Sequence, residues 1–157
     1  MTPKPISHEV LVAAPPERAF ELFAAKLGDW WPLAYTFGEA DCEDALIEPR
    51  AGGRWFERTR DGKELSWGEV RAYEPGRRLV LEFAIGADRK PAPPGRSSEV
   101  EVRFVPEGEQ QTRVQLEHRA FERHGEGAET LRSGMNGAQG WPLILAEFRR
   151  AVRRATR

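Results

Sequence analysis

The residue types best suited to catalysis and metal binding are scarce in this 157-residue chain, which holds three histidines and one cysteine. Metal sites often use spacings such as Cys-x-x-Cys or His-Glu-x-x-His, and neither occurs here. Cys42 stands in the acidic run Asp41-Cys42-Glu43-Asp44, which disfavours a thiolate nucleophile. The sequence also lacks a phosphate-loop string and a nucleophile-elbow serine. We therefore expect no metal and no cofactor.

Two ionisable residues are candidates for function because they fall at positions where apolar residues are expected. Glu57 lies in the strand-like run Arg54–Thr59, His118 lies in the run Thr112–Arg119, and both fall on the apolar side of an alternating pattern. An unpaired charge on such a face is costly, and burial there shifts pKa values in ways that suit a general acid or base. Simpler interpretations remain open, namely a carboxylate that reaches water or an arginine, and a hydrogen-bonded core or rim histidine.

Turn signals indicate the elements that position these side chains. Asp61-Gly62, Pro75-Gly76 and Pro106-Glu107-Gly108 are typical of tight turns between strands. Short strand-like runs joined by such turns predict an antiparallel meander. The expected strands are Ile6–Val12, Ala40–Ile47, Arg54–Thr59, Leu65–Tyr73, Arg78–Ile85, Ser98–Val105 and Thr112–Arg119.

Two helical stretches bracket the strands. The first follows Pro15-Pro16, and the second begins close to Trp141, because Pro142 suits only a first turn; looser Gly-rich turns are expected from Gly125 to Gly140. Both carry an apolar stripe at helical spacing, formed by Phe20, Phe23, Ala24 and Leu27 and by Trp141, Ile144, Leu145, Phe148 and Val152. The second stripe is flanked by Arg149, Arg150, Arg153, Arg154 and Arg157. These arginines fit a solvated face that complements the helix dipole better than a nucleic-acid patch.

If both hairpins have two-residue turns, Trp55 faces Gly68, Phe56 faces Trp67, and the small Gly68 leaves room beside Trp55. Side chains alternate between the faces of a sheet, so an apolar face with a few polar groups is expected, although one bulge would reverse part of this assignment. Such a face is typical of a ligand pocket. The candidate ligand-binding residues are Trp31, Trp55, Glu57, Ser66, Gly68, Phe83, Phe104, His118, Trp141 and Leu145.

On the opposite, charged face the same register places Phe56 beside Trp67. This pair is interpreted either as an isolated cross-strand pair or as an exposed interaction surface. The Pro-rich segment Gly86 to Arg96 is interpreted either as a floppy connection or as a flap over a pocket.

Several local strings occur in an order that resembles the START-like, or SRPBCC, superfamily, and within it the branch named for the activator of a heat-shock ATPase. They are Ala13-Ala14-Pro15-Pro16-Glu17-Arg18-Ala19-Phe20, Trp30-Trp31-Pro32, Pro49-Arg50-Ala51-Gly52-Gly53-Arg54-Trp55, Asp61-Gly62, Gly68-Glu69-Val70, Pro75-Gly76-Arg77-Arg78-Leu79 and Gly140-Trp141. The resemblance implies an α+β helix-grip fold. In it, a curved antiparallel sheet of about seven strands wraps a long C-terminal helix, short helices follow the first strand, and an apolar cavity lies between sheet and helix.

Length and charge narrow the classes of function. The chain fits one domain, residues 1–157, and the formal net charge of −1 gives no global attraction to nucleic acid. No signal-like segment and no run of roughly 20 apolar residues is present, so we expect a cytoplasmic protein without a membrane partner. A homodimer is compatible with all readings.

Three functions are weighed. The preferred one is binding of a hydrophobic or aromatic small molecule, as a carrier, sensor or sequestering protein. The alternatives are a protein-interaction or chaperone-regulating module of the stress response that uses Phe56 and Trp67, and a cyclase or hydrolase with His118 or Glu57 as acid or base.

Overall fold

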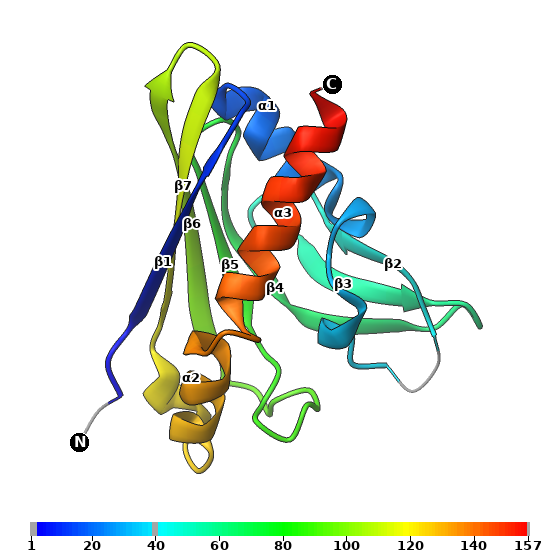
Figure 1. The fold of residues 1–157 in the computed structure, drawn as a ribbon. Coiled ribbons are helices and arrows are strands. Elements are labelled where there is room, and N and C mark those ends of the chain that lie inside the picture. Colours follow the sequence, from blue (N-terminus) through cyan, green and yellow to red (C-terminus); the bar gives the residue numbers. More distant parts are fainter. Residues whose placement is uncertain (1–2, 39–40, 157) are drawn as a thin grey trace.

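The computed structural model describes residues 3–38 and 41–156, in which seven antiparallel strands form one curled sheet of order β1-β7-β6-β5-β4-β3-β2. The long helix α3 packs against one face of this sheet (Figure 1). The strands are β1 (Ile6–Val12), β2 (Cys42–Ile47), β3 (Arg54–Thr59), β4 (Glu64–Glu74), β5 (Arg78–Phe83), β6 (Ser98–Gly108) and β7 (Gln111–Arg119). This architecture confirms the helix-grip fold; of the expected strand Ala40–Ile47, Ala40 lies outside the described residues.

Short helical turns connect β1 to β2, as expected. They are α1 (Pro16–Phe20), the π turn η1 (Glu21–Ala25), and the 3₁₀ turns η2 (Leu27–Asp29) and η3 (Leu33–Tyr35). The predicted apolar stripe of this region is buried at all four positions. A further 3₁₀ turn, η4 (Phe121–His124), follows β7.

The C-terminal third contains one helix more than the sequence analysis predicts. Helix α3 (Trp141–Ala155) starts where expected, with Pro142 in its first turn. The preceding segment, predicted as loose turns, instead contains helix α2 (Ala128–Asn136), which buries Leu131 and Met135 on one face. This helix is short, has Gly134 in its interior and follows a glycine in left-handed conformation, so its pattern is easily taken for a loop.

The β3–β4 hairpin has a three-residue loop, because the backbone N–H of Thr59 donates to the carbonyl of Lys63. A bulge at Trp67 absorbs the extra residue and restores the predicted pairing of Trp55 with Gly68. Between the loop and the bulge, however, the register differs from the prediction by one residue. Trp67 therefore lies in the apolar core, 1 % exposed, and its predicted place on the outer face is wrong.

Two other predictions about this hairpin are also wrong. Ser66 is exposed to solvent and does not point into the core. The rings of Trp31, Trp67 and Phe83 pack against Trp55, so Gly68 leaves no free room there. A Cβ atom at Gly68 would instead lie 1.9 Å from the carbonyl oxygen of Glu82, so this glycine permits the backbones of β4 and β5 to approach each other.

Phe56 does lie on the outer face, but it is 3 % exposed. The guanidinium groups of Arg54 and Arg58 cover its ring, at 4.1 and 6.0 Å from the ring centroid. With Trp67 in the core and Phe56 covered, the expected exposed aromatic pair does not exist.

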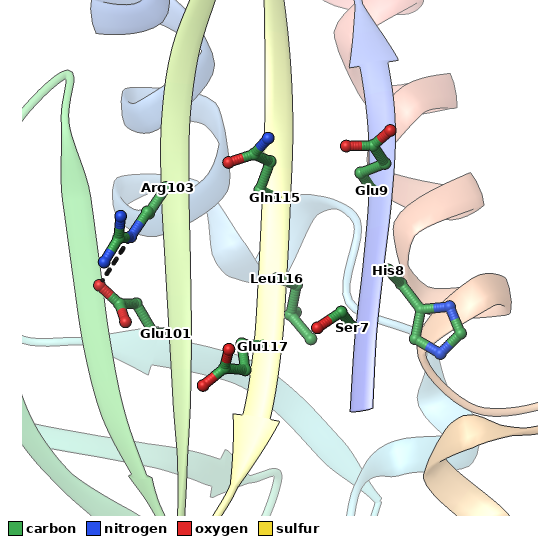
Figure 2. A pocket seen from close by; sticks show the side chains of 8 residues that line it. All are labelled: Ser7, His8, Glu9, Glu101, Arg103, Gln115, Leu116 and Glu117. Carbon is green, nitrogen blue, oxygen red and sulfur yellow. Dashed lines mark hydrogen bonds and ion pairs between the residues drawn. The ribbon is translucent and has the colours of Figure 1, made fainter. Parts of the chain in front are cut away.

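The rest of the outer face carries ion pairs. On it, β1, β6 and β7 form an open hollow of about 640 Å³ (Figure 2). Glu101, one of the lining residues, accepts hydrogen bonds from Arg78, Arg103 and Arg119. Burial alone would raise the pKa of Glu101, but these three guanidinium groups outweigh it and lower the pKa to about 2.

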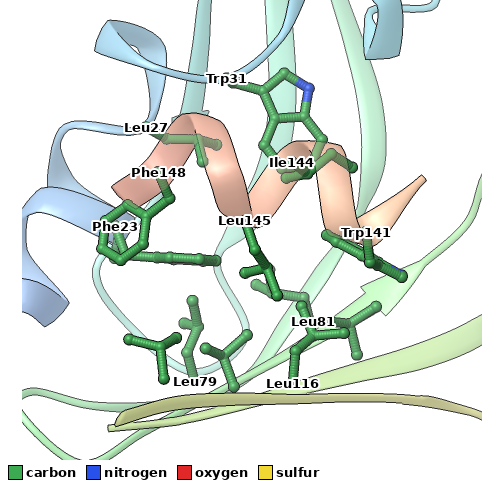
Figure 3. Packing of buried hydrophobic residues seen from close by; sticks show 14 of the residues in the cluster. Phe23, Leu27, Trp31, Leu79, Leu81, Leu116, Trp141, Ile144, Leu145 and Phe148 are labelled. Atoms are coloured by element: carbon green, nitrogen blue, oxygen red, sulfur yellow. The ribbon is translucent and has the colours of Figure 1, made fainter. Parts of the chain in front are cut away.

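Buried hydrophobic side chains of α3 and of the inner face of the sheet belong to one cluster (Figure 3). Ile144, Leu145 and Phe148 of the helix occupy the space above the sheet, and all three are at most 2 % exposed. The buried side chains that surround them include Phe23, Leu27, Trp31, Leu79, Leu81, Leu116 and Trp141. Among the described residues, no helix is long and apolar enough to cross a bilayer.

Candidate functional site

Four tryptophans form a cluster where the sequence predicts a cavity. Trp31, Trp55, Trp67 and Trp141 come from four different elements or loops, and each is at most 8 % exposed. The ring centroid of Trp31 lies 6.0 Å from that of Trp55, 5.4 Å from that of Trp67 and 6.3 Å from that of Trp141. These four residues and Leu145 are buried members of the same hydrophobic core. We refer to the four residues as the tryptophan cluster.

The indole nitrogens differ in how they are satisfied. Four of the five tryptophans donate to a protein acceptor: Trp30 to the Leu22 carbonyl, Trp31 to the Tyr35 carbonyl, Trp67 to Glu57 and Trp141 to His118. Trp55 Nε1 is buried without an acceptor, and it alone has this status among the buried side-chain nitrogens and oxygens of the described chain. An unsatisfied buried donor costs about 1–3 kcal/mol, so the Trp55 indole is an unusual feature of this core.

Glu57 is fully buried and reaches neither water nor an arginine. Its carboxylate accepts hydrogen bonds from the backbone N–H groups of Phe37 (2.5 Å) and Gly38 (3.1 Å) and from Trp67 Nε1 (2.9 Å). Charge-assisted bonds of this kind are about twice as strong as neutral ones. Glu57 therefore anchors the segment after η3 to the sheet.

His118 is a hydrogen-bonded core histidine. Its Nδ1 accepts from Trp141 Nε1 at 3.0 Å, and its Nε2 lies 2.7 Å from Ser98 Oγ, which in turn lies 2.7 Å from His124 Nε2. Burial lowers the pKa of His118 well below its usual value, and a proton on the nearby His124 would lower it further; burial also lowers the pKa of His124. Both imidazoles are thus neutral, and His118 Nε2–H donates to Ser98 Oγ.

An apolar hollow of about 280 Å³ lies beside the tryptophan cluster, between α2, the end of β5 and the segment around η3. We call it the α2 hollow. Its lining residues are Tyr35, Phe37, Phe83, Ile85, Gly86, Ala87, Arg89, Thr130, Leu131, Gly134, Met135 and Gln139. Of the ten ligand-binding candidates from the sequence, Phe83 lines this hollow. Phe104 lies in the core with the other aromatic residues.

The Pro-rich segment forms one wall of the α2 hollow and is structured. Ile85 pairs with Pro91 in an isolated bridge. Arg89 donates to the carbonyl of Ala34 at 2.7 Å, and its guanidinium lies 4.9 Å from the centroid of the Phe37 ring. These contacts connect the flap to the segment that Glu57 anchors, so the structure supports the flap interpretation.

Metal binding, thiol chemistry and the outer-face hollow offer less support for a functional site than the α2 hollow does. Within residues 3–38 and 41–156, no three His, Cys, Asp or Glu side chains are placed to hold a metal ion together. Burial, helped by the nearby carboxylate of Glu57, raises the pKa of the Cys42 thiol, which agrees with the expected absence of a thiolate. The outer-face hollow of Figure 2 is lined mainly by charged and polar groups, so it does not suit an apolar molecule.

Comparison with known proteins places the chain in a family. Residues 13–153 match the family described as activator of Hsp90 ATPase homolog 1-like protein, and the chain belongs to this family, which is of the SRPBCC type. Among proteins with curated descriptions, none matches the sequence.

Several solved structures are similar to this chain over nearly its whole length. The anthrahydroquino-γ-pyrone synthase Txn09, solved in complex with SUM, is 34 % identical, with a TM-score of 0.65 over 96 % of this chain and 97 % of that one. CalC, a self-sacrificing resistance protein from Micromonospora echinospora, is 29 % identical, with a TM-score of 0.72 over 97 % and 96 %. The protein MLL2253 from Mesorhizobium loti shares the fold at 18 % identity and a TM-score of 0.69, over 96 % and 98 % of the two chains. The family and these neighbours support a ligand-binding fold.

Proposed function

We propose that this protein binds a hydrophobic or aromatic small molecule in the α2 hollow. The observation that carries the proposal is the hollow itself, whose lining combines aromatic and aliphatic side chains with a few polar groups at the rim. It lies beside the tryptophan cluster, which offers further aromatic surface. The similarity to a synthase solved in complex with SUM and to a resistance protein supports a role in handling a small molecule.

The alternatives have less support. The interaction module was motivated by an exposed Phe56 and Trp67, and both side chains are buried. For the enzyme, Glu57 and His118 are engaged with protein partners through both of their side-chain heteroatoms, and neither lines the α2 hollow. A catalytic role for either residue therefore has no supporting contact.

Gly134 offers a sharp test, because it lines the α2 hollow and a Cβ atom there would meet nothing within 4 Å. Fluorene, a rigid apolar molecule, serves as the probe, and its binding is followed by chemical shifts of the lining residues. We expect Gly134→Leu to weaken binding at least tenfold by filling the hollow, and the matched Gly134→Ala to bind nearly as well as the original protein. Absence of binding by both fluorene and its ketone analogue 9-fluorenone, or equal binding by Gly134→Leu, would overturn the proposal.

A further inference from the structure

We propose that Trp55 Nε1 is a ligand-binding donor, and that the site therefore selects planar aromatic molecules that carry a neutral oxygen acceptor, such as a ketone or a phenol. This inference rests on the proposed function and adds the chemistry by which a ligand is recognised.

Trp55 differs from the other four tryptophans in its hydrogen bonding. The sequence provides five indole N–H groups, and the fold supplies four of them with an acceptor within 3.0 Å. Trp55 is 1 % exposed and has none. Since buried donors are nearly always paired, the missing acceptor is expected to come from a molecule that binds beside this ring.

Trp55 lies one ring away from the lining of the α2 hollow. The Trp55 ring packs against Phe83, with 6.0 Å between ring centroids, and Phe83 lines the hollow. Phe37, another lining residue, is half-buried and lies 5.7 Å from the ring of Trp67, which itself lies 5.4 Å from that of Trp55. A layer of phenyl rings thus stands between the hollow and the tryptophan cluster. A planar ligand that displaces one of these rings reaches Trp55.

The surroundings of Trp55 favour a neutral acceptor over an anionic one. The ring of Trp55 is surrounded by Trp31, Trp67 and Phe83, and the carboxylate of Glu57 is bound to the neighbouring Trp67. An anionic acceptor would meet repulsion from that carboxylate in a medium of low dielectric constant. A neutral carbonyl or hydroxyl oxygen accepts from the indole without this penalty.

The test compares 9-fluorenone with fluorene, which share a ring skeleton and differ in one ketone oxygen. Trp55→Phe removes the N–H and keeps an aromatic ring. Trp30→Phe is the matched control, because Trp30 is also buried but donates to the Leu22 carbonyl. We expect Trp55→Phe to weaken fluorenone binding about tenfold and to leave fluorene binding unchanged, whereas Trp30→Phe changes neither.

A second readout needs no variant to fold. In the ¹⁵N–¹H spectrum of the original protein, the Trp55 indole proton should move downfield on addition of fluorenone and not on addition of fluorene. If fluorenone binds without moving this signal, or binds Trp55→Phe equally well, the inference is wrong while the proposed function stands. If neither probe binds, the proposed function fails, and the inference fails with it.

Discussion

The indole N–H of Trp141, the first residue of α3, donates to Nδ1 of His118 on β7 across 3.0 Å. This bond connects the start of the C-terminal helix to the C-terminal end of β7, the strand next to the edge strand β1. On its other side, His118 is joined through Ser98 to His124. These hydrogen bonds run from α3 through β7 to the turn η4. They require a neutral His118, because a protonated Nδ1 has no lone pair to accept a hydrogen bond from Trp141.

Acidification should therefore destabilise the protein. The pKa values of His118 and His124 are lowered in the folded state, so below about pH 6.5 the unfolded chain binds protons that the folded protein does not. Their contribution to stability is complete above pH 6.5 and falls as the pH drops, by at most about 1.4 kcal/mol per pH unit for each histidine. Urea unfolding between pH 7.5 and 5 measures this slope.

The His118→Gln variant should lose about half of the slope, at the cost of lower stability at pH 7.5. His8→Gln is the control, because His8 lies on β1, contacts Asn136 and takes no part in the hydrogen bonds around His118. A slope in His118→Gln that equals the original one would contradict the assignment.

Glu57→Gln should destabilise the protein by about 1–3 kcal/mol. The two oxygens of the carboxylate accept hydrogen bonds from three N–H groups, whereas the amide of glutamine has only one oxygen that can accept. The segment around Phe37 and Gly38 should also loosen, which faster amide hydrogen exchange there would reveal. Glu64→Gln, on the exposed part of β4, is the control and should change the unfolding free energy by less than about 1 kcal/mol. Equal effects of the two substitutions would argue against an anchoring role for Glu57.

Much of the fold follows from the sequence, and the errors have specific physical causes. The bounds of β1 and β3 agree with the predictions at every residue, because alternation and turn residues are local signals. The orientation of Trp67 could not be predicted from the sequence, since it depends on a bulge that compensates for a hairpin loop one residue longer than expected. Helix α2 is missed because its few buried residues stabilise it through tertiary packing.

The candidate site is less predictable than the fold. Phe83 was found from strand alternation, but Leu131 and Met135 line the α2 hollow from a helix that the sequence analysis did not predict. Their spacing of four residues was the available signal. The missing acceptor of Trp55 depends on the positions of all neighbouring side chains, so no sequence pattern reports it.

Gly68 should tolerate no side chain. Gly68→Ala would place a methyl group 1.9 Å from a backbone oxygen, and backbone atoms of paired strands cannot move aside without breaking the ladder. We expect a loss of more than about 3 kcal/mol or failure to fold. Gly62→Ala is the matched control: Gly62 has a φ of +85° but its Cβ would meet nothing within 4 Å, so backbone strain of about 1 kcal/mol is the whole expected effect. Thermal unfolding of both variants separates steric overlap from strain.

Glu101 should stabilise the protein against acid. Its folded pKa of about 2 lies below the value of about 4.5 expected for an unfolded glutamate, so its contribution is complete above pH 4.5 and is lost as the pH falls toward 2. We expect about 2 kcal/mol, less than the full shift implies, because the three arginines are partly exposed to solvent. Urea unfolding from pH 6 to pH 2 should show Glu101→Gln losing less stability than the original protein over this range. Parallel curves for the two proteins would show that the arginines do not hold this carboxylate as the structure indicates.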